Sequence, residues 1–407
     1  MQNEFSIIKQ EIYDELTKNI LPFWMERMVD EKNGGFFGQI NGENKLVSEA
    51  PKGGILNARI LWTFSSAVLN LKNSQYLKYA ERAKNYILNH FFDAENGGTY
   101  WMLHADGTPA DTKKQIYSQA FFIYALTELH RASGDEECLS KAKDLFHLIE
   151  KHSFDSEKNG YFEAYSRDWQ LLDDLRLSEK DANEKKTMNT HLHILEAYTN
   201  LYRVWKDENL EKQLQNLIEL FLTKIINPRT HHLDLFFDED WNCKSTIISY
   251  GHDIECAWLL NEAAEVLGNE NLMNRVFKET LLVTEASSEG IQSNGGLINE
   301  KNYQTGHTDK NFDWWPQAEG MVGFFHAFQQ TKNEYYALRT ASLWSFIQEN
   351  IIDHDEGEWF WSVTETGIKN TKDDKAGFWK CPYHNSRMCL EMIRRIENTF
   401  DNNEDSN

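Results

Sequence analysis

The chain has 407 residues and a formal net charge of −22, which argues against nucleic acid and anionic membrane surfaces as partners because both are polyanions. Hydrophobic residues make up 41% of the chain, enough for a large core. Its 13 tryptophans and 16 tyrosines exceed what a core needs, and their flat faces with a polar tip suit amphipathic ligands such as sugars.

The cysteines and the N-terminus bear on the compartment. The five cysteines form no CxxC pair and have no metal-type spacing, and their odd number is typical of free thiols in a reducing compartment. The N-terminal stretch MQNEFSIIKQEIYDEL has the pattern of an amphipathic helix, not of an apolar signal. No apolar run reaches membrane-spanning length. We therefore predict a soluble, cytoplasmic protein.

A turn pattern recurs six times along the chain. Three copies are clear and three are weaker: DEKNGGFF at 30–37, DAENGGTYW at 93–101, DSEKNGYF at 155–162, RTHHLDLFF at 229–237, SNGGLIN at 293–299 and DHDEGEWFW at 353–361. The markers that we align are 62 to 73 residues apart: Gly34, Gly97, Gly160, Leu233, Gly295 and Gly357. Asp or Asn followed by Gly and aromatic residues is typical of a tight hairpin. A near-constant period predicts a repeat architecture.

Between the turns the chain reads as pairs of helices, with apolar residues at i, i+3, i+4 and i+7. The expected pairs are 54–71 with 75–92, 116–132 with 136–152, 191–205 with 211–226, 252–268 with 271–286, 315–330 with 334–351, and 383–400 with 4–20. The first helix of each pair is apolar nearly all round and suits an inner ring, whereas the second is charged on one face. Because the last helix can close against the first, we predict an all-α fold, a single (α/α)6 barrel over residues 1–407. An open helical solenoid is the alternative.

The starts of the six inner helices align, and equivalent positions in a ring face one point. The aligned residues are Arg59, Phe121, His193, Glu255, Glu319 and Arg387. Five of these six are polar or charged, and charged groups inside a ring are costly unless they are paired or used. The alignment predicts a functional site at the end of the barrel where the inner helices begin.

Neighbouring residues reinforce this prediction. His252, His384 and Asn189 each lie about one turn before an aligned residue. Tryptophans occur at the same helix starts: Trp314, Trp315 and Trp379. A lone histidine at a helix start usually caps it, but three histidines on matched turns favour a site. The dipole at a helix start lowers a histidine pKa and favours the neutral base.

A metal site and a phosphate site are weaker interpretations. The pairs at 191–193 and 231–232 lack zinc-type spacing, and two histidines two positions apart on a helix point to different faces. No glycine-rich segment has the order of a phosphate-binding loop. We expect neither a metal nor another cofactor.

Two histidines facing one cavity suit removal and return of a proton at a carbon next to a carbonyl. Arg59 could stabilise the oxyanion that develops, and Glu255 could orient His252. Glycoside hydrolysis, which needs two carboxylates, is the competing chemistry. Glu255, Glu319 or Asp253 could supply them, but the histidines would then have no role.

Three segments resemble the cellobiose 2-epimerases of the N-acylglucosamine 2-epimerase superfamily: GHDIECAWLLNEAAEVLG (251–268), WWPQAEG (314–320) and KCPYHNSRMCLEM (380–392). The resemblance spans essentially the whole chain. It implies an (α/α)6 barrel and cofactor-free conversion of the reducing-end glucose of β-1,4-linked disaccharides to mannose, through ring opening, a cis-enediolate and rotation about C2–C3. Cellobiose would give 4-O-β-glucosyl-mannose and lactose would give epilactose. Mannose-type aldose–ketose isomerases and N-acylglucosamine 2-epimerases of the superfamily are the alternatives.

The resemblance also assigns roles to residues. It implies that His252 and His384 are the acid/base pair, that Arg59 holds the enediolate oxygens and that His193 assists. The expected substrate-binding residues are Tyr117, Asp181, Asn189, Glu255, Trp315, Glu319, Trp379 and Arg387. Among them Tyr117 would lie near C2, the tryptophans would stack on the sugars, and Glu255 would support His252.

The long charged segment 165–187 accounts for much of the longest step between the turns. A long loop beside a site is often a lid, so we expect this loop to close over the far sugar. The expected partner is a small disaccharide, and we expect a monomer.

Overall fold

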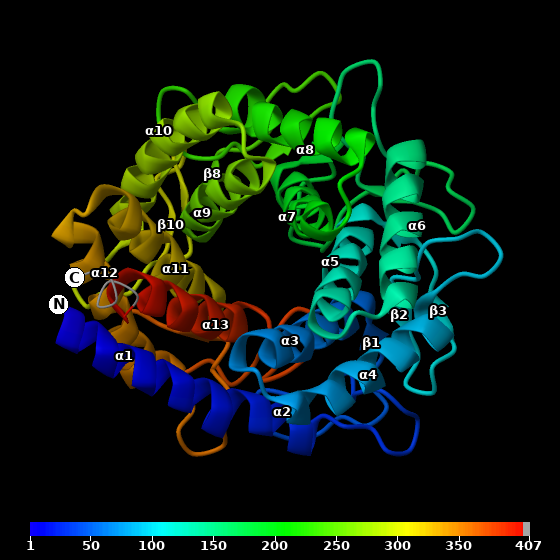
Figure 1. Cartoon of the computed structure of the whole chain (residues 1–407), viewed down its shortest axis with the longest axis horizontal. Helices are drawn as coiled ribbons and strands as arrows, with labels where there is room; N and C mark the ends of the chain where they lie inside the picture. The colour runs from blue at the N-terminus through cyan, green and yellow to red at the C-terminus, as the bar shows by residue number, and fades with distance from the viewer. Residues whose placement is uncertain (402–407) are drawn as a thin grey trace.

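Two concentric rings of helices make up the molecule, and the computed structural model describes residues 1–401 (Figure 1). The inner helices are α3 (Gly54–Leu71), α5 (Ile116–Ser133), α7 (Met188–Val204), α9 (Tyr250–Leu267), α11 (Trp314–Thr331) and α13 (His384–Ile396). Five outer helices are α4 (Leu77–Tyr86), α6 (Glu136–His152), α8 (Glu208–Leu220), α10 (Glu270–Ser287) and α12 (Glu334–Phe346). The sixth is continuous through α1 (Gln2–Asp14), η1 (Glu15–Ile20) and α2 (Leu21–Arg27).

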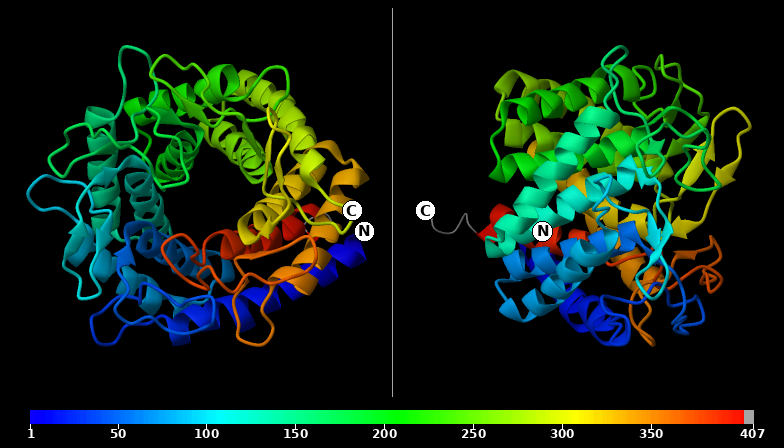
Figure 2. Two further views of the ribbon diagram at one scale, coloured as in Figure 1. Left: turned by 180° about the vertical axis from the view of Figure 1, so that it is seen from behind. Right: turned by 90° about the vertical axis from the view of Figure 1, so that its right-hand side faces the viewer.

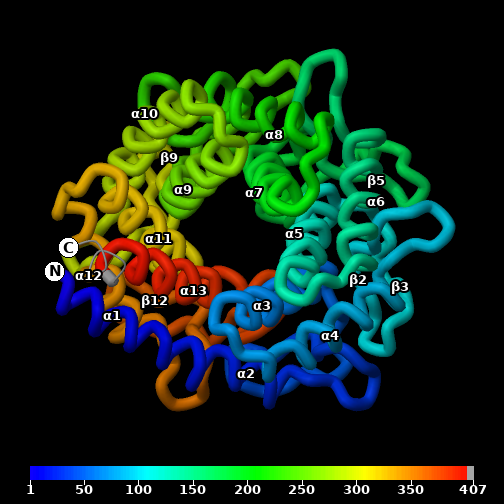
Figure 3. Tube along the Cα trace, in the orientation of Figure 1, coloured from blue at the N-terminus to red at the C-terminus, as the bar shows by residue number. Residues whose placement is uncertain are grey.

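The ring is closed. Each inner helix contacts the next one along the chain, and α13 contacts both α3 and α1. The first and last described helices, α1 and α13, therefore lie side by side, as Figure 3 shows. The predicted (α/α)6 barrel is confirmed, and the open solenoid is wrong. None of the helices formed by residues 1–401 has both the length and the apolar composition needed to cross a membrane.

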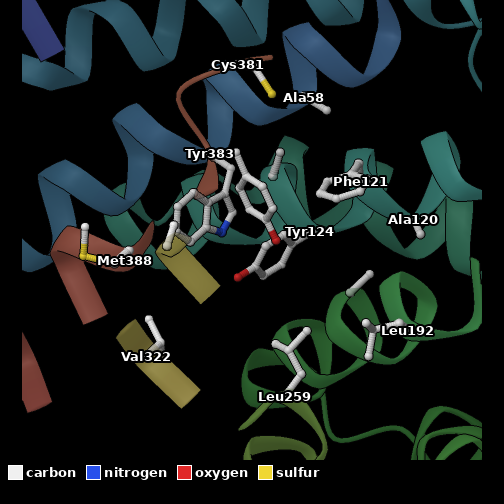
Figure 4. Packing of buried hydrophobic residues seen from close by; sticks show 14 of the residues in the cluster. Ala58, Ala120, Phe121, Tyr124, Leu192, Leu259, Val322, Cys381, Tyr383 and Met388 are labelled. Atoms are coloured by element: carbon white, nitrogen blue, oxygen red, sulfur yellow. The ribbon is translucent and has the colours of Figure 1, made fainter. Parts of the chain in front are cut away.

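Burial distinguishes the two rings, as their sequences predict. Every residue of α5 from Ile116 to Leu129 is buried, because this helix packs against neighbours on all sides. The outer helix α8 instead buries the side chains of one face, including Leu210, Leu214 and Leu217. Side chains from several inner helices meet near the barrel axis, where Tyr124 and Tyr383 lie together (Figure 4).

Six matched β-bridges close the six turns, so the sixfold repeat is confirmed. They join Val29 to Phe36, Phe92 to Thr99, Phe154 to Tyr161, Ile226 to Leu233, Ile291 to Leu297 and Ile352 to Trp359. Five turns have a glycine with positive φ, such as Gly34 at 81°. In the fourth turn His231 takes this conformation with φ 59°, so the turn centre lies two residues before the predicted marker Leu233.

Short strands lie on the side of the barrel where the inner helices begin (Figure 2). They are β1 (Lys52–Gly53), β2 (Met102–Leu103), β3 (Pro109–Asp111), β4 (Lys114–Gln115), β5 (Ala164–Tyr165), β6 (Lys186–Thr187), β7 (Phe236–Phe237), β8 (Ile247–Ser249), β9 (Glu300–Asn302), β10 (Thr308–Asp309), β11 (Phe312–Asp313) and β12 (Ser362–Val363). The strand before an inner helix pairs antiparallel with a strand of the following repeat, as β8 pairs with β9. This pairing fixes where the inner helices start.

Buried lysine–aspartate pairs hold the turns against these strands. Lys52 is bound to Asp30 at 2.8 Å, and both side chains are fully buried. Three further pairs repeat the arrangement: Lys114 with Asp93, Lys186 with Asp155 and Lys375 with Asp353. In each pair the aspartate belongs to a turn and the lysine lies before the inner helix that follows that turn, so each pair ties a turn to the start of an inner helix.

Removing one member of such a pair should be strongly destabilising. Asp30→Asn should lower the free energy of unfolding by about 3–5 kcal/mol, because Lys52 would stay buried without its counter-charge. Urea denaturation measures the change. Glu43→Gln, which removes the exposed partner of Lys45, should leave the midpoint unchanged because water screens that pair. Equal shifts of the two midpoints would show that the buried pair contributes no more than an exposed one.

Candidate active site

A cavity of about 200 Å³ opens at the end of the barrel where the inner helices begin. Its walls are formed by Arg59, Tyr117, Asn189, His193, His252, Glu255, Asp313, Trp314, Trp315, Trp361, Trp379 and His384. The structure thus brings together nine of the twelve predicted site residues. The other three lie outside this lining: Glu319 and Arg387 lie behind the wall, and Asp181 lies in the adjoining loop.

His384 is the first residue of α13, and Nδ1 of its ring is 2.7 Å from Oε1 of Glu319. Arg387 and the hydrogen bond from His384 lower the pKa of Glu319, although burial acts in the other direction. An ionised carboxylate can only accept, so Nδ1 of His384 carries the hydrogen and Nε2 keeps its lone pair. Burial lowers the pKa of His384 to about 3, with Glu319 opposing the shift. His384 is therefore a neutral base near pH 7.

His252 has a different partner from the predicted one. Nδ1 of His252 lies 2.8 Å from Oγ of Ser249, whereas Glu255 accepts a hydrogen bond from Nη2 of Arg387 at 2.6 Å. The expectation that Glu255 orients His252 is therefore wrong. Burial lowers the pKa of His252 to about 3. Because a hydroxyl both donates and accepts, Ser249 permits either tautomer of His252.

His193 is held by a carboxylate that the sequence analysis did not identify. Nδ1 of His193 is 2.9 Å from Oε2 of Glu196, one turn later on α7. The other oxygen of Glu196 accepts hydrogen bonds from Arg387 and Tyr383. Burial, together with the charges of Arg59 and Arg387, lowers the pKa of His193 well below its ordinary value. The third histidine of the cavity is therefore also neutral.

Arg387 is the hub behind the cavity wall and is 1% exposed. It pairs with Glu196 through Nη1, and its Nη2 donates to Glu255 at 2.6 Å and to Glu319 at 2.7 Å. Burial and the nearby charge of Glu319 raise the pKa of Glu255. The pKa of Glu319 is lowered instead, so Glu255 is the first of these two carboxylates to take up a proton as the pH falls.

Arg59 differs from Arg387 because it forms no ion pair with any residue in 1–401. Its Nη2 donates to the hydroxyl of Tyr117 at 2.8 Å, and its guanidinium lies 4.2 Å from the ring centre of Phe121. Arg59 is only 3% exposed, and its Nε has no hydrogen-bond partner among the described residues. A buried cation without a counter-ion is suited to an anion that forms during a reaction.

Indole rings cover the histidines. The Trp315 ring lies 4.6 Å from the ring of His252 and 5.8 Å from that of His384, measured between centroids. Gly251 makes room for it, because a Cβ at Gly251 would lie 2.6 Å from two carbons of Trp315. Trp361, which the sequence analysis missed, completes the aromatic wall with Trp379.

Two wider clefts, of about 320 and 550 Å³, adjoin the cavity and share Asn189 with it. The long loop contributes four residues to the lining of both clefts: Leu177, Ser178, Lys180 and Asp181. Asp181 lines both clefts and accepts hydrogen bonds from the backbone and side chain of Ser178 at 2.8 and 3.0 Å. The smaller of the two clefts also contains His252.

The alternative histidine pairs are structural. His191 accepts a hydrogen bond from the backbone N–H of Tyr161, while His193 faces the cavity. His231 and His232 contact different carboxylates. Within residues 1–401 the group with metal-ligand spacing is Glu255, Glu319 and His384, and Nη2 of Arg387 already binds both of its carboxylates. This arrangement does not suit a cation.

Together, the fold and the cavity define the class: an (α/α)6-barrel protein with a carbohydrate-type site of neutral histidines, a buried arginine and indole faces. The chain belongs to the N-acylglucosamine 2-epimerase (GlcNAc 2-epimerase) family, whose model matches residues 35–387.

Relatives of known activity cover nearly the whole chain. A cellobiose 2-epimerase of Bacteroides fragilis is 55% identical over 387 residues, which span 95% of this chain and 99% of the relative. A cellobiose 2-epimerase of Ruminococcus albus is 42% identical over 95% of this chain and 98% of its own length. The solved structure of cellobiose 2-epimerase from Bacillus thermoamylovorans superposes with a TM-score of 0.92 at 40% identity, covering 96% and 100% of the two chains. A D-mannose isomerase structure, at 20% identity and a TM-score of 0.83, shares the fold.

Gly251→Ala should impair the site. The new Cβ would push Trp315 away from His252, so kcat/KM should fall about 10- to 100-fold. The thermal midpoint should fall as well, because the same Cβ would lie 2.9 Å from Cγ of Pro316 and overpack the helix start. Gly320→Ala, whose Cβ would meet Leu343 of the outer ring at 2.9 Å, is the matched control and should keep the wild-type rate. Steady-state kinetics would contradict this role of Gly251 if the two variants were equally active.

Proposed function

We propose that this chain inverts C2 of the reducing-end glucose in β-1,4-linked disaccharides, converting cellobiose into 4-O-β-glucosyl-mannose and lactose into epilactose. The observation that carries the proposal is the pair of neutral histidines, His252 and His384, which both lie beside Trp315 in one cavity. Cellobiose 2-epimerases at 36% to 55% identity support the choice of substrate.

The geometry supports a two-histidine proton transfer at C2. In the open-chain sugar, Nε2 of one histidine takes the C2 proton and the C–H electron pair moves through C1 to the carbonyl oxygen, which gives a cis-enediolate. The second histidine takes a proton from solvent and delivers it to the opposite face of C2, and the carbonyl forms again. Glu319 stabilises the protonated form of His384, while Ser249 lets His252 carry its hydrogen on Nε2. The first histidine then gives the abstracted proton to solvent, which leaves both rings neutral again.

Arg59 is the group that we assign to the enediolate oxygens. Its charge has no counter-ion in the described chain, so it is available when the oxyanion forms. Tyr117 accepts a hydrogen bond from Arg59 and thereby keeps its own O–H free for a sugar oxygen. Donors that are positioned in advance toward such a charge contribute about 10²- to 10³-fold in rate.

The surroundings of the cavity favour a disaccharide. The two clefts beside the loop 165–187 extend from the cavity and provide room for a second sugar. Within this proposal Asp181 contacts that sugar, Trp315 and Trp379 stack on the sugars, and the loop acts as a lid. Glu319 and Arg387 act by positioning His384, in place of the substrate contacts that the sequence predicts for them.

Glycoside hydrolysis is disfavoured by the carboxylates. Glycosidases place two carboxyl groups on either side of the scissile bond, about 5–9.5 Å apart. Glu255 and Glu319 instead have oxygens within 4.8 Å of each other, and both bind Nη2 of Arg387. The α-mannanase structure with a TM-score of 0.66 and 13% identity shares the fold alone.

The proposal includes a monomeric, cytoplasmic enzyme that needs neither a metal nor an organic cofactor. The guanidinium of Arg387 between Glu255 and Glu319 supports metal independence. The net charge of −22 supports the absence of nucleic-acid and membrane partners.

NMR of cellobiose in D2O tests the function. The wild-type protein should produce a mannose unit at the reducing end, with deuterium at C2. His384→Asn should reduce this exchange by about 10²- to 10⁴-fold, because a catalytic base is removed. His354→Asn, at an exposed histidine outside the cavity, should exchange normally. Release of free glucose, or accumulation of a ketose as the main product, would refute the proposed activity.

Glu319→Gln tests how His384 is positioned. We expect kcat to fall about 10²- to 10⁴-fold with a much smaller change in KM, because an amide neither fixes the Nδ1–H tautomer nor stabilises the imidazolium. Steady-state kinetics with cellobiose give both constants. Glu262→Gln, which removes the partner of Arg203, is the matched control. An unchanged kcat in the Glu319 variant would show that His384 does not depend on this carboxylate.

A further inference from the structure

Asp313 occupies a helix-capping position but does not act as a cap. It ends β11 and is the N-cap residue of α11, where an aspartate side chain normally accepts a hydrogen bond from the helix start. Asp135 and Asp207 do so at the starts of α6 and α8. The side chain of Asp313 makes no such bond. Its carboxylate is therefore free for another partner.

The backbone of Asp313 is fixed while its carboxylate is left unpaired. Residue 313 pairs with Ser362 in the β11–β12 ladder, and its carbonyl accepts a hydrogen bond from Gln317 at 2.9 Å. Within residues 1–401, the carboxylate has neither a hydrogen bond nor an ion pair. It lines the reaction cavity together with His252 and His384. A half-buried acceptor without a partner is costly unless a ligand supplies the donor.

The position of Asp313 in the ring of helices indicates which part of a bound sugar it faces. Helix α11 lies between α9, which carries His252, and α13, which carries His384 (Figure 1). Across the ring from α11 lies α5, which carries Tyr117, the hydrogen-bond partner of Arg59. Asp313 therefore faces the edge of the sugar that is remote from the oxygens assigned to Arg59.

We propose that Asp313 is a substrate-contacting residue whose carboxylate accepts hydrogen bonds from hydroxyl groups on that remote edge of the reducing-end sugar. This inference rests on the proposed function and adds a contact that determines affinity. Other carboxylates surround Asp313, so the ligand that it accepts is a neutral polyhydroxy compound and not a sugar phosphate.

The charged groups around Asp313 make this contact dependent on pH. Burial raises its pKa to about 7, with Asp309, Glu300 and Asp373 adding to the shift and Lys180 of the loop opposing it. The two histidines of the cavity are neutral in this range. Glu255 of the same cavity titrates at higher pH, because burial and the charge of Glu319 raise its pKa to about 8. As pH falls through about 7 the carboxylate gains a proton and becomes a weaker acceptor, so KM should rise on the acid side.

Asp313→Asn is the test, because asparagine keeps the shape and is an equally good N-cap residue. We expect KM for cellobiose to rise about 10- to 100-fold, as for the loss of hydrogen bonds to a charged group, while kcat changes much less. The KM of the variant should also lose its dependence on pH between about 6 and 7, below the pKa of Glu255. Asp207→Asn at the capped start of α8 is the matched control and should keep the wild-type KM.

The inference is overturned if KM is unchanged in Asp313→Asn, if the rise of KM below about pH 7 persists in the variant, or if only the thermal midpoint falls. Direct titration of cellobiose by calorimetry separates this result from the proposed activity. If the wild-type protein binds cellobiose without exchanging its C2 proton, the proposed function fails, and weaker binding by Asp313→Asn still supports the contact. If the wild-type protein does not bind cellobiose, both proposals fail.

Discussion

The guanidinium of Arg387 is the interaction on which the rest of the site depends. It extends from α13 and binds Glu196 on α7, Glu255 on α9 and Glu319 on α11, so one side chain links four of the six inner helices. Each of these carboxylates is buried, and a buried charge without a partner costs several kcal/mol. The negative charge that the ring concentrates near its axis is therefore stable only while Arg387 is in place.

The chemistry of the cavity is built on this hub. Glu319 and Glu196 each bind Arg387 and also contact a histidine. The ion pairs of Arg387 therefore also fix the orientation of the imidazole rings of His384 and His193. Burial keeps the histidines neutral, and the indoles beside them restrict water. The two buried arginines, Arg387 and Arg59, thus have different roles. Arg387 is saturated with carboxylates and holds the structure, whereas Arg59 has no counter-ion in the described chain and remains available to a reacting oxygen.

Much of this arrangement could be predicted from the repeat. A nearly constant spacing of turns specifies equivalent helix starts, and equivalent positions in a closed ring converge, which is why Arg59, His193 and Arg387 were found. The hydrogen-bond partners of these side chains were harder to predict. The three-residue spacing of His252 and Glu255 places them on one helix face, but Arg387 reaches Glu255 from across the ring.

The site residues that the sequence did not reveal were missed for physical reasons that differ from one residue to the next. The three-residue spacing that suggested Glu255 would have found Glu196 beside His193, where it is correct. Ser249 and Trp361 enter the site through strands and turns, whose position relative to the helices follows from tertiary packing. Asp313 was hidden because an aspartate before a helix is normally explained as a cap.

The position of Arg387 along the chain has a consequence for how the protein folds. An open array of helix pairs can add one repeat at a time, each stabilised by the one before it. Here the three carboxylates belong to earlier helices, and their counter-ion comes on the last inner helix. During synthesis the emerging helix pairs would have to keep those acids hydrated or protonated until α13 leaves the ribosome. The cavity would then form in one late, cooperative step, when the C-terminal helix docks against α3 and α1 and the ring closes.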